Sequence, residues 1–362
     1  MTPLADILAA RIAAEGPLPF ESFMEIALYD PAHGYYTAGS PFGPAGDFYT
    51  GPAVSGALGR ALGRHLAAQL AGLGISPADL VELGAGDGSL AAAVAPVVAA
   101  GVGLRSLRLV DRNIGRLPRK MAGSLPAVRR SSSPDRLPPG LAGAVYANEL
   151  LDALPVARYE RSRDGSLRKS WVDFRSGRFI ETWRADSGEA AREYARRYLP
   201  AAPAVYVFEH PLHIPPLLTR IGRRLRRGLV VFIDYGDRAP GLLTAERAGG
   251  TLRAFRRHRV SGALLDQPGA QDLTADVNFD FVMDCAREAG LAAAAYCTQG
   301  RFLAENGLLE EFRVGTDPAS LNHNQALKHL LLPGGMGEVF KILVLGKAAG
   351  PARSSSRRSR RG

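Results

Sequence analysis

The segment LVELGAGDGSL, residues 80–90, constrains the fold more than any other part of the sequence. An apolar run reaches Glu82, and glycines then follow at alternate positions, Gly84, Gly86 and Gly88. Glycines directly after a buried strand allow tight turns and let the backbone approach a ligand closely. If a helix follows, its first amide groups face that ligand. The segment therefore predicts a strand, a ligand-binding loop and a helix in succession.

The rest of the chain alternates short apolar segments with segments of helical periodicity. Strands are predicted at 79–83, 104–111, 143–149, 204–210, 229–236 and 340–346, and helices at 1–30, 53–71, from about 88, and at 187–198. This alternation predicts an α/β fold with a doubly wound sheet. Ligands of such sheets bind beyond the carboxyl ends of the strands, which is where the glycine loop belongs.

Two segments depart from this alternation. Residues 156–184 alternate polar and apolar positions around Asp164-Gly165 and Ser176-Gly177, which predicts an antiparallel insertion. The Gly/Pro/aromatic loop at 30–52 is long for a connector, and such loops often carry function. We therefore divide the chain into an N-terminal helical segment with a lid loop (1–52), a ligand-binding core (53–155), an inserted hairpin and helix (156–203), the remaining core (204–347) and a disordered basic tail (348–362).

Composition limits the location and the partners. The two cysteines, Cys285 and Cys297, show neither metal-ligand spacing nor a disulfide framework, so we expect a cytoplasmic protein without a metal. No apolar run reaches the roughly 20 residues of a membrane span. The net charge is +10, but residues 347–362 hold six basic residues and no acid, which leaves +4 for the rest. This distribution does not favour a nucleic-acid partner. The oligomeric state stays open, with a homodimer as one option.

The residues of the glycine loop distinguish between three possible ligands, a dinucleotide, a nucleoside triphosphate and S-adenosylmethionine. A dinucleotide fingerprint needs a glycine or alanine at position 89, where the chain has Ser89, and no Lys-Ser/Thr pair marks a triphosphate loop. Glu82 would instead suit a cationic ligand with ammonium and sulfonium groups. Asp111, at the end of the next strand, is placed to accept the hydroxyls of a ribose. We predict S-adenosylmethionine as the cofactor; the plainer alternative is that the glycines only make a turn.

Several further segments carry a resemblance to a known family: YDPAHGYYT, GDFYTGPAVS, VELGAGDGSL, ANELLDALPV, VFIDYGD, GTLRAF, QDLTADVNF, TQGRFL and MGEVFKILVLG. In this order, across about residues 17–347, they resemble the MidA-like family of class I methyltransferases. The resemblance implies a Rossmann-like core with an inserted antiparallel β/helical element on the substrate side and an N-terminal helical lid. It also implies methylation of a protein arginine, with a respiratory-complex subunit as one candidate substrate.

An arginine acceptor stays protonated at neutral pH, so it needs carboxylates to hold its planar guanidinium group. The loop YANELLDALP supplies Glu149 and Asp152, with Asn148 at the strand tip beside the cofactor. We assign Glu149 as the guanidinium ligand and Asp152 as its support or as a helix cap. The alternative is that Asn148 and Asp152 only order the turn.

Other residues are weaker candidates for the acceptor side of the site. They are Asp47 as a further carboxylate, Phe48 and Tyr49 as apolar walls of the lid, Asp234 and Tyr235 at the tip of the strand at 229–236, and His258 and Gln299 in loops. Each also has a plainer explanation as a packed turn or a solvated loop residue. Three other functions stay open: methylation of a small molecule, a cofactor-binding assembly protein without catalysis, and a nicotinamide-dependent oxidoreductase.

Overall fold

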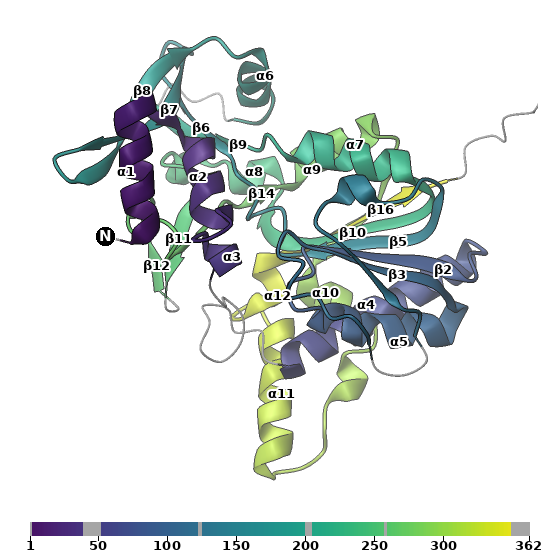
Figure 1. The fold of residues 1–362 in the computed structure, drawn as a ribbon. Helices are drawn as coiled ribbons and strands as arrows, with labels where there is room; N and C mark the ends of the chain where they lie inside the picture. Colours follow the sequence, from purple (N-terminus) through teal and green to yellow (C-terminus); the bar gives the residue numbers. More distant parts are fainter. Residues whose placement is uncertain (1, 39–51, 122–124, 200–204, 257–258, 349–362) are drawn as a thin grey trace, which may run out of the picture.

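The computed structural model describes residues 2–38, 52–121, 125–199, 205–256 and 259–348. Its centre is an eight-stranded sheet, shown in Figure 1. The strands run in the order β15 (Ala292–Thr298), β16 (Phe340–Lys347), β10 (Leu225–Asp237), β5 (Leu141–Asn148), β2 (Ala78–Leu83), β3 (Leu104–Val110) and β4 (Val128–Ser131), and β14 (Val277–Asn278) pairs with the end of β10. From β10 to β4 the strands are parallel, whereas β16 is antiparallel to both of its neighbours. The predicted α/β class is confirmed.

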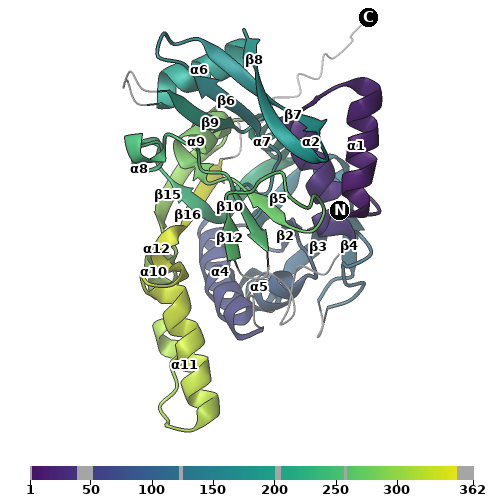
Figure 2. The same cartoon turned by 90° about the vertical axis from the view of Figure 1, so that its left-hand side faces the viewer.

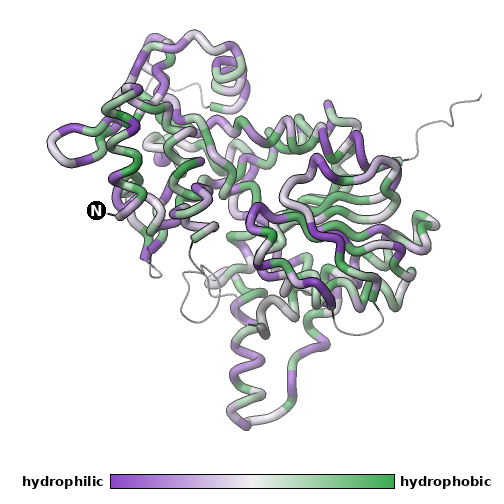
Figure 3. Tube along the Cα trace, in the orientation of Figure 1, coloured by the Kyte–Doolittle hydropathy of each residue, from purple (hydrophilic) through white to green (hydrophobic). Residues whose placement is uncertain are grey.

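Helices cover both faces of this sheet because the side chains of each strand alternate between the faces. On β2, Leu80 joins the core beneath α4 (Pro52–Gly72) and α5 (Ser89–Val102). Val81 and Leu83 join the opposite core, beneath α7 (Ile214–Arg224) and α9 (Phe279–Glu288). Figure 3 shows the hydrophobic residues concentrated on these central strands.

A second sheet lies beside the carboxyl ends of the central strands. Its strands are β1 (Leu18–Pro19), β7 (Leu167–Arg175), β6 (Ala157–Arg161) and β9 (Tyr206–His210), with β8 (Arg178–Asp186) paired to β7. The predicted hairpins are present, and Ser176 and Gly177 both have positive φ, as a tight hairpin turn requires. The strand predicted at 204–210 for the core is instead β9 of this sheet, because it pairs with β6. The inserted element therefore continues past residue 203 to His210.

The N-terminal helices pack against this second sheet. They are α1 (Pro3–Glu15), α2 (Phe20–Tyr29) and α3 (Tyr35–Ala38), and they share a core with Val172 of β7 and Leu273 of β13. A small sheet of β12 (Arg259–Ser261), β11 (Arg253–Arg256) and β13 (Asp272–Thr274) completes the layer. Figures 1 and 2 both show α1 and α2 beside β7, and Figure 1 shows β14 on the same side of the central sheet.

The remaining elements are short or lie at the edges. They are η1 (Pro134–Arg136), α6 (Glu189–Tyr198), α8 (Ala239–Leu242), η2 (Ala245–Arg247), α10 (Gln299–Glu305), η3 (Leu309–Glu311), α11 (Pro318–Leu331) and α12 (Met336–Val339). Figure 2 shows α11 projecting from the body as an arm. Among the helices in the described ranges, none combines the length and the apolarity that a bilayer span requires.

Candidate functional site

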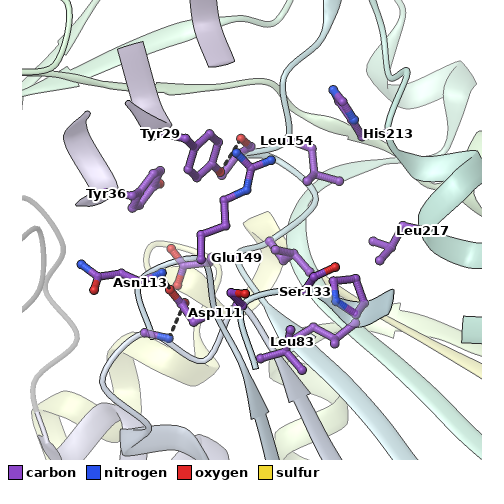
Figure 4. A pocket seen from close by; sticks show the side chains of 18 of the residues that line it. Tyr29, Tyr36, Leu83, Asp111, Asn113, Ser133, Glu149, Leu154, His213 and Leu217 are labelled. Carbon is purple, nitrogen blue, oxygen red and sulfur yellow. Dashed lines mark hydrogen bonds between the residues drawn. The ribbon is translucent and has the colours of Figure 1, made fainter. Parts of the chain in front are cut away.

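A cavity of about 270 Å³ lies between the carboxyl ends of the central strands and the N-terminal helices. Leu83, Gly84, Gly86 and Asp111 line one side, which we call the floor, and Tyr29, Tyr36 and Thr37 line the other, the roof. Figure 4 shows Glu149 between Tyr29 on the roof and Asp111 on the floor. Ser132, Ser133, Pro134 and Leu217 also line the cavity. The predicted ligand-binding edge of the sheet is therefore hollow, as the glycine loop requires.

The three glycines of the loop all have left-handed backbone conformations. Their φ angles are +67° at Gly84, +54° at Gly86 and +79° at Gly88, a region that side chains disfavour. Gly84 and Gly86 line the cavity, whereas Gly88 begins α5 and lies against Pro118. The loop therefore brings two of the three glycines to the ligand, and the third fixes the start of the helix.

Asp111 lies directly after β3 and on the floor of the cavity. Its Oδ2 atom accepts a hydrogen bond from the amide of Gly86 at 2.9 Å, and Oδ1 accepts one from the amide of Asn113 at 2.8 Å. A carboxylate has about four acceptor sites, so each oxygen keeps capacity for one hydroxyl group. This donor and acceptor arrangement fits the two hydroxyls of a ribose.

Glu82 lies behind the glycine loop rather than on the cavity wall. Its side chain is 3% exposed, and Oε2 accepts a hydrogen bond from the hydroxyl of Tyr146 at 3.1 Å. Burial raises the pKa of Glu82 to about 8. The predicted contact with an ammonium group therefore has no support from the position of this side chain and stays a prediction.

Glu149 faces the cavity from an unusual backbone position. Its φ angle is +50°, which is uncommon for any residue other than glycine, and its amide donates to the carbonyl of Ile233 at 2.9 Å. The side-chain amide of Asn148 donates to Oε1 and the hydroxyl of Tyr235 donates to Oε2, each at 3.0 Å. Burial raises the pKa of Glu149, and these two donors oppose that shift because they stabilise the charged form. A carboxylate held at both oxygens is thus presented to the cavity.

Two further carboxyl groups lie behind Glu149. Asp234 accepts hydrogen bonds from the amides of Leu150 at 3.2 Å and Leu151 at 2.8 Å, which fixes the loop that follows Glu149. Burial raises the pKa of Asp234 to about 7. Burial and the neighbouring Asp234 raise the pKa of Asp152 well above its usual range. Because both pKa values are raised, the pair favours protonated forms more than two free carboxylates would.

The structure separates the two roles that the sequence left open for Asp152. No helix starts in the turn that follows β5, so Asp152 caps none there. Its side chain is 3% exposed and absent from the cavity wall, and Oδ1 has no hydrogen-bond partner. Asp152 thus lies where a supporting residue would, behind Glu149, together with Asp234 and Tyr235.

The other predicted site residues have mixed outcomes. Asp47, Phe48, Tyr49 and His258 lie outside the described residues. Gln299 is fully buried at the start of α10, where its amide donates to the carbonyl of Leu330 at 3.2 Å. It does not line the cavity, so the structure gives its assignment to the acceptor side no support.

The roof contains residues that the sequence did not single out. The rings of Tyr29 and Tyr36 stack with centroids 5.6 Å apart. Tyr29 donates its hydroxyl to the carbonyl of Ala153 at 2.9 Å, and Tyr36 donates to Asp272 Oδ2 at 3.0 Å. Both rings are therefore fixed in place. Both lie in the segment YDPAHGYYT that carries the resemblance, but their role at the cavity comes from the packing of α2 and α3 over the loop after β5.

Within the described ranges, no group of three or more His, Cys, Asp or Glu side chains is arranged to hold a metal ion. Glu149 and Asp234 instead accept hydrogen bonds from amide and hydroxyl donors.

Comparison with known proteins identifies relatives of the chain. Residues 127–297 match a family described as "Putative S-adenosyl-L-methionine-dependent methyltransferase". A Drosophila melanogaster protein named "Protein arginine methyltransferase NDUFAF7 homolog, mitochondrial" is 28% identical, over 94% of this chain and 84% of the relative.

Two solved structures from Burkholderia thailandensis are also similar. One, an uncharacterized protein of the COG1565 superfamily, is 32% identical with a TM-score of 0.82, over 96% of this chain and 92% of that one. The other, a member of the same superfamily bound to S-adenosyl-homocysteine, is 31% identical with a TM-score of 0.84, over 96% of this chain and 93% of that one.

Proposed function

This chain belongs to the COG1565 superfamily of S-adenosylmethionine-dependent methyltransferases, and on that premise we propose that it methylates an arginine side chain of a protein. The observation that carries the proposal is Glu149, a carboxylate held at both oxygens and turned toward the cavity. The name of the Drosophila melanogaster relative, a protein arginine methyltransferase, supports the same acceptor.

The cavity floor fits the methyl donor. Asp111 has free acceptor capacity for the ribose hydroxyls, and the backbone at Gly84 and Gly86 leaves no side chain in the way. When bound, S-adenosylmethionine supplies a methyl group on a positively charged sulfur. A cation of this kind is compatible with a site whose described carboxylates are Asp111 and Glu149.

Glu149 would hold the acceptor and orient it. A guanidinium group is a planar fork of donors that a carboxylate can bind through two hydrogen bonds. Binding in this way places one nitrogen toward the methyl donor, and positioning supplies much of the catalysis in such displacements. Each transfer also releases one proton from the attacking nitrogen, and Glu149 is placed to accept it late in the reaction. The hydrogen bonds from Tyr235 and Asn148 favour the charged carboxylate and oppose the rise in its pKa that burial causes.

Labelling in a lysate tests the proposal. The purified protein is incubated with a cell lysate and radiolabelled S-adenosylmethionine, and the labelled species is analysed by mass spectrometry. We expect a labelled protein with the added mass on an arginine. Label on a small molecule would contradict the proposed acceptor, and no labelled product would favour a cofactor-binding assembly protein. The cytoplasmic location, the homodimer and a respiratory-complex substrate stay predictions, and the same experiment identifies the substrate.

A further inference from the structure

The roof of the cavity holds an arginine of the chain itself. The guanidinium carbon of Arg112 lies 4.1 Å from the centre of the Tyr29 ring. The same guanidinium group forms an ion pair with Glu25, with Nη2 donating to Oε2 at 3.3 Å and Nη1 bonded to Oε1. Glu25 and Tyr29 are four residues apart on α2, so both face the same side of the helix. An aromatic face and a bidentate carboxylate are two preferred partners of arginine.

This contact belongs to the same cavity as Glu149. Arg112, Tyr29 and Glu149 all line it, and the Tyr29 hydroxyl is bonded to Ala153, in the loop that carries Glu149. The ring of Tyr36 stacks on the Tyr29 ring. The ring is therefore a fixed surface, and Arg112 shows that this surface accepts a guanidinium group. The contact is also easily replaced, because the side chains of Arg112 and Glu25 are 45% and 40% exposed.

We propose that Tyr29, in the roof of the cavity, and Glu25, beside it on α2, form a guanidinium-binding slot, and that the acceptor arginine competes with Arg112 for it. This inference rests on the proposed function. It adds a recognition site on α2 that selects arginine before the side chain reaches Glu149. Arg112 then acts as an internal competitor that lowers the affinity for weak acceptors.

The competition predicts opposite effects for two substitutions. Arg112→Ala removes the internal competitor, so the protein should bind N-acetyl-arginine amide at least threefold more tightly. Tyr29→Leu removes the aromatic face and should weaken binding at least fivefold, whereas Tyr29→Phe keeps the ring and should weaken it less. If Arg112 served only to attach α2 to the core, its removal would loosen the roof and weaken binding.

Calorimetric titration of each protein, saturated with S-adenosyl-homocysteine, with N-acetyl-arginine amide tests the slot. The matched control is Arg11→Ala, since Arg11 has similar exposure and also pairs with a glutamate, Glu15 on α1. Tighter binding by Arg112→Ala and unchanged binding by the control would support the slot. Unchanged or weaker binding by Arg112→Ala, in protein whose thermal unfolding is cooperative, would overturn it. If mass spectrometry placed the methyl group on an atom outside arginine, the proposed function would fail, and this titration would still decide the slot.

Discussion

The hydroxyl of Tyr235 donates a 3.0 Å hydrogen bond to Oε2 of Glu149, although the two residues are 86 positions apart in the chain. The bond joins the tips of two adjacent parallel strands, β5 and β10, at the edge where the cavity opens. Tyr235 is in turn packed against Phe340 of β16, with ring centres 4.2 Å apart. Three strands of the sheet thus determine the position of one carboxylate.

Replacing Glu149 should separate chemistry from cofactor binding. We expect Glu149→Ala to abolish methyl transfer, because the guanidinium ligand is lost, and to leave the affinity for S-adenosylmethionine within several-fold. Methyl transfer is measured with radiolabelled donor and affinity by calorimetry. Glu305→Ala is the matched control, since Glu305 pairs with Arg301 on the surface of α10, away from the cavity wall. Wild-type turnover in Glu149→Ala would rule out the assigned role.

Tyr235→Phe should change the pH dependence of the reaction. The hydroxyl lowers the pKa of Glu149 by stabilising its charged form, so its removal should raise that pKa. Activity that needs the charged carboxylate is lost as the pH falls through this pKa. The acid limb of the kcat/KM profile should therefore move to higher pH in the variant. An unchanged acid limb would show that the tyrosine has only a packing role.

Asp111→Ala should weaken cofactor binding. Charge-assisted hydrogen bonds to two hydroxyls contribute about 1.5–3 kcal/mol each, so we expect the Kd for S-adenosyl-homocysteine to rise at least about tenfold. Asp87→Ala is the control, because Asp87 is an exposed acid of the same loop that does not line the cavity. Equal losses in the two variants would point to a general effect of charge. Titration with NAD should give no binding in either variant or in the wild type.

Glu82→Gln should remove a pH-dependent cost of folding. The pKa of Glu82 is raised to about 8 in the folded state, so between about pH 4.5 and 8 the folded protein binds the proton more tightly than the unfolded chain does. The tighter binding of this proton stabilises the folded state at low pH, and the stabilisation is lost as the pH rises through 8. Urea unfolding at pH 6 and pH 9 should show a smaller loss of stability in Glu82→Gln than in the wild type. The same variant tests the predicted contact between Glu82 and the ammonium group of the cofactor. A large drop in the affinity for S-adenosylmethionine would support that contact.

Gly88→Ala and Gly140→Ala form a matched pair for the glycine loop. Their φ angles are nearly equal, +79° and +78°, so both substitutions carry the left-handed penalty of about 1–2 kcal/mol. An added Cβ would lie 2.8 Å from Pro118 at position 88, but would meet nothing within 4 Å at position 140. We expect Gly88→Ala to cost about 1–3 kcal/mol more, measured by urea unfolding. Equal costs would show that Pro118 moves aside freely.

The sequence predicted the elements whose signals are local. The glycine loop, Asp111 after the next strand, and Glu149 after the third all lie at the cavity, because parallel strands place their carboxyl ends on one edge. The face of a strand is not a local signal. Glu82 and Leu83 point to opposite sides of β2, and only the packed helices show that Leu83 faces the cavity.

Pairing between distant segments was also beyond the sequence. The apolar pattern of β9 fits either sheet, and only its pairing with β6 places it in the second sheet. Tyr29 has the helical spacing of a core residue, yet it also lines the cavity. Such assignments depend on contacts between segments far apart in the chain, such as Ala157 with His210 and Tyr29 with Ala153, which periodicity does not encode.

The contacts of the N-terminal helices set an order for folding during synthesis. Leu18 and Pro19 pair with β7, the hydroxyl of Tyr36 bonds to Asp272, and the hydroxyl of Thr2 bonds to the carbonyl of Pro268. These helices leave the ribosome before the strands on which they pack, and the surface that receives them is complete only after about residue 274 has been made. The apolar faces of these helices therefore remain without their native packing partners while most of the chain is translated. The cavity between these helices and the central sheet therefore closes only late in synthesis and folding.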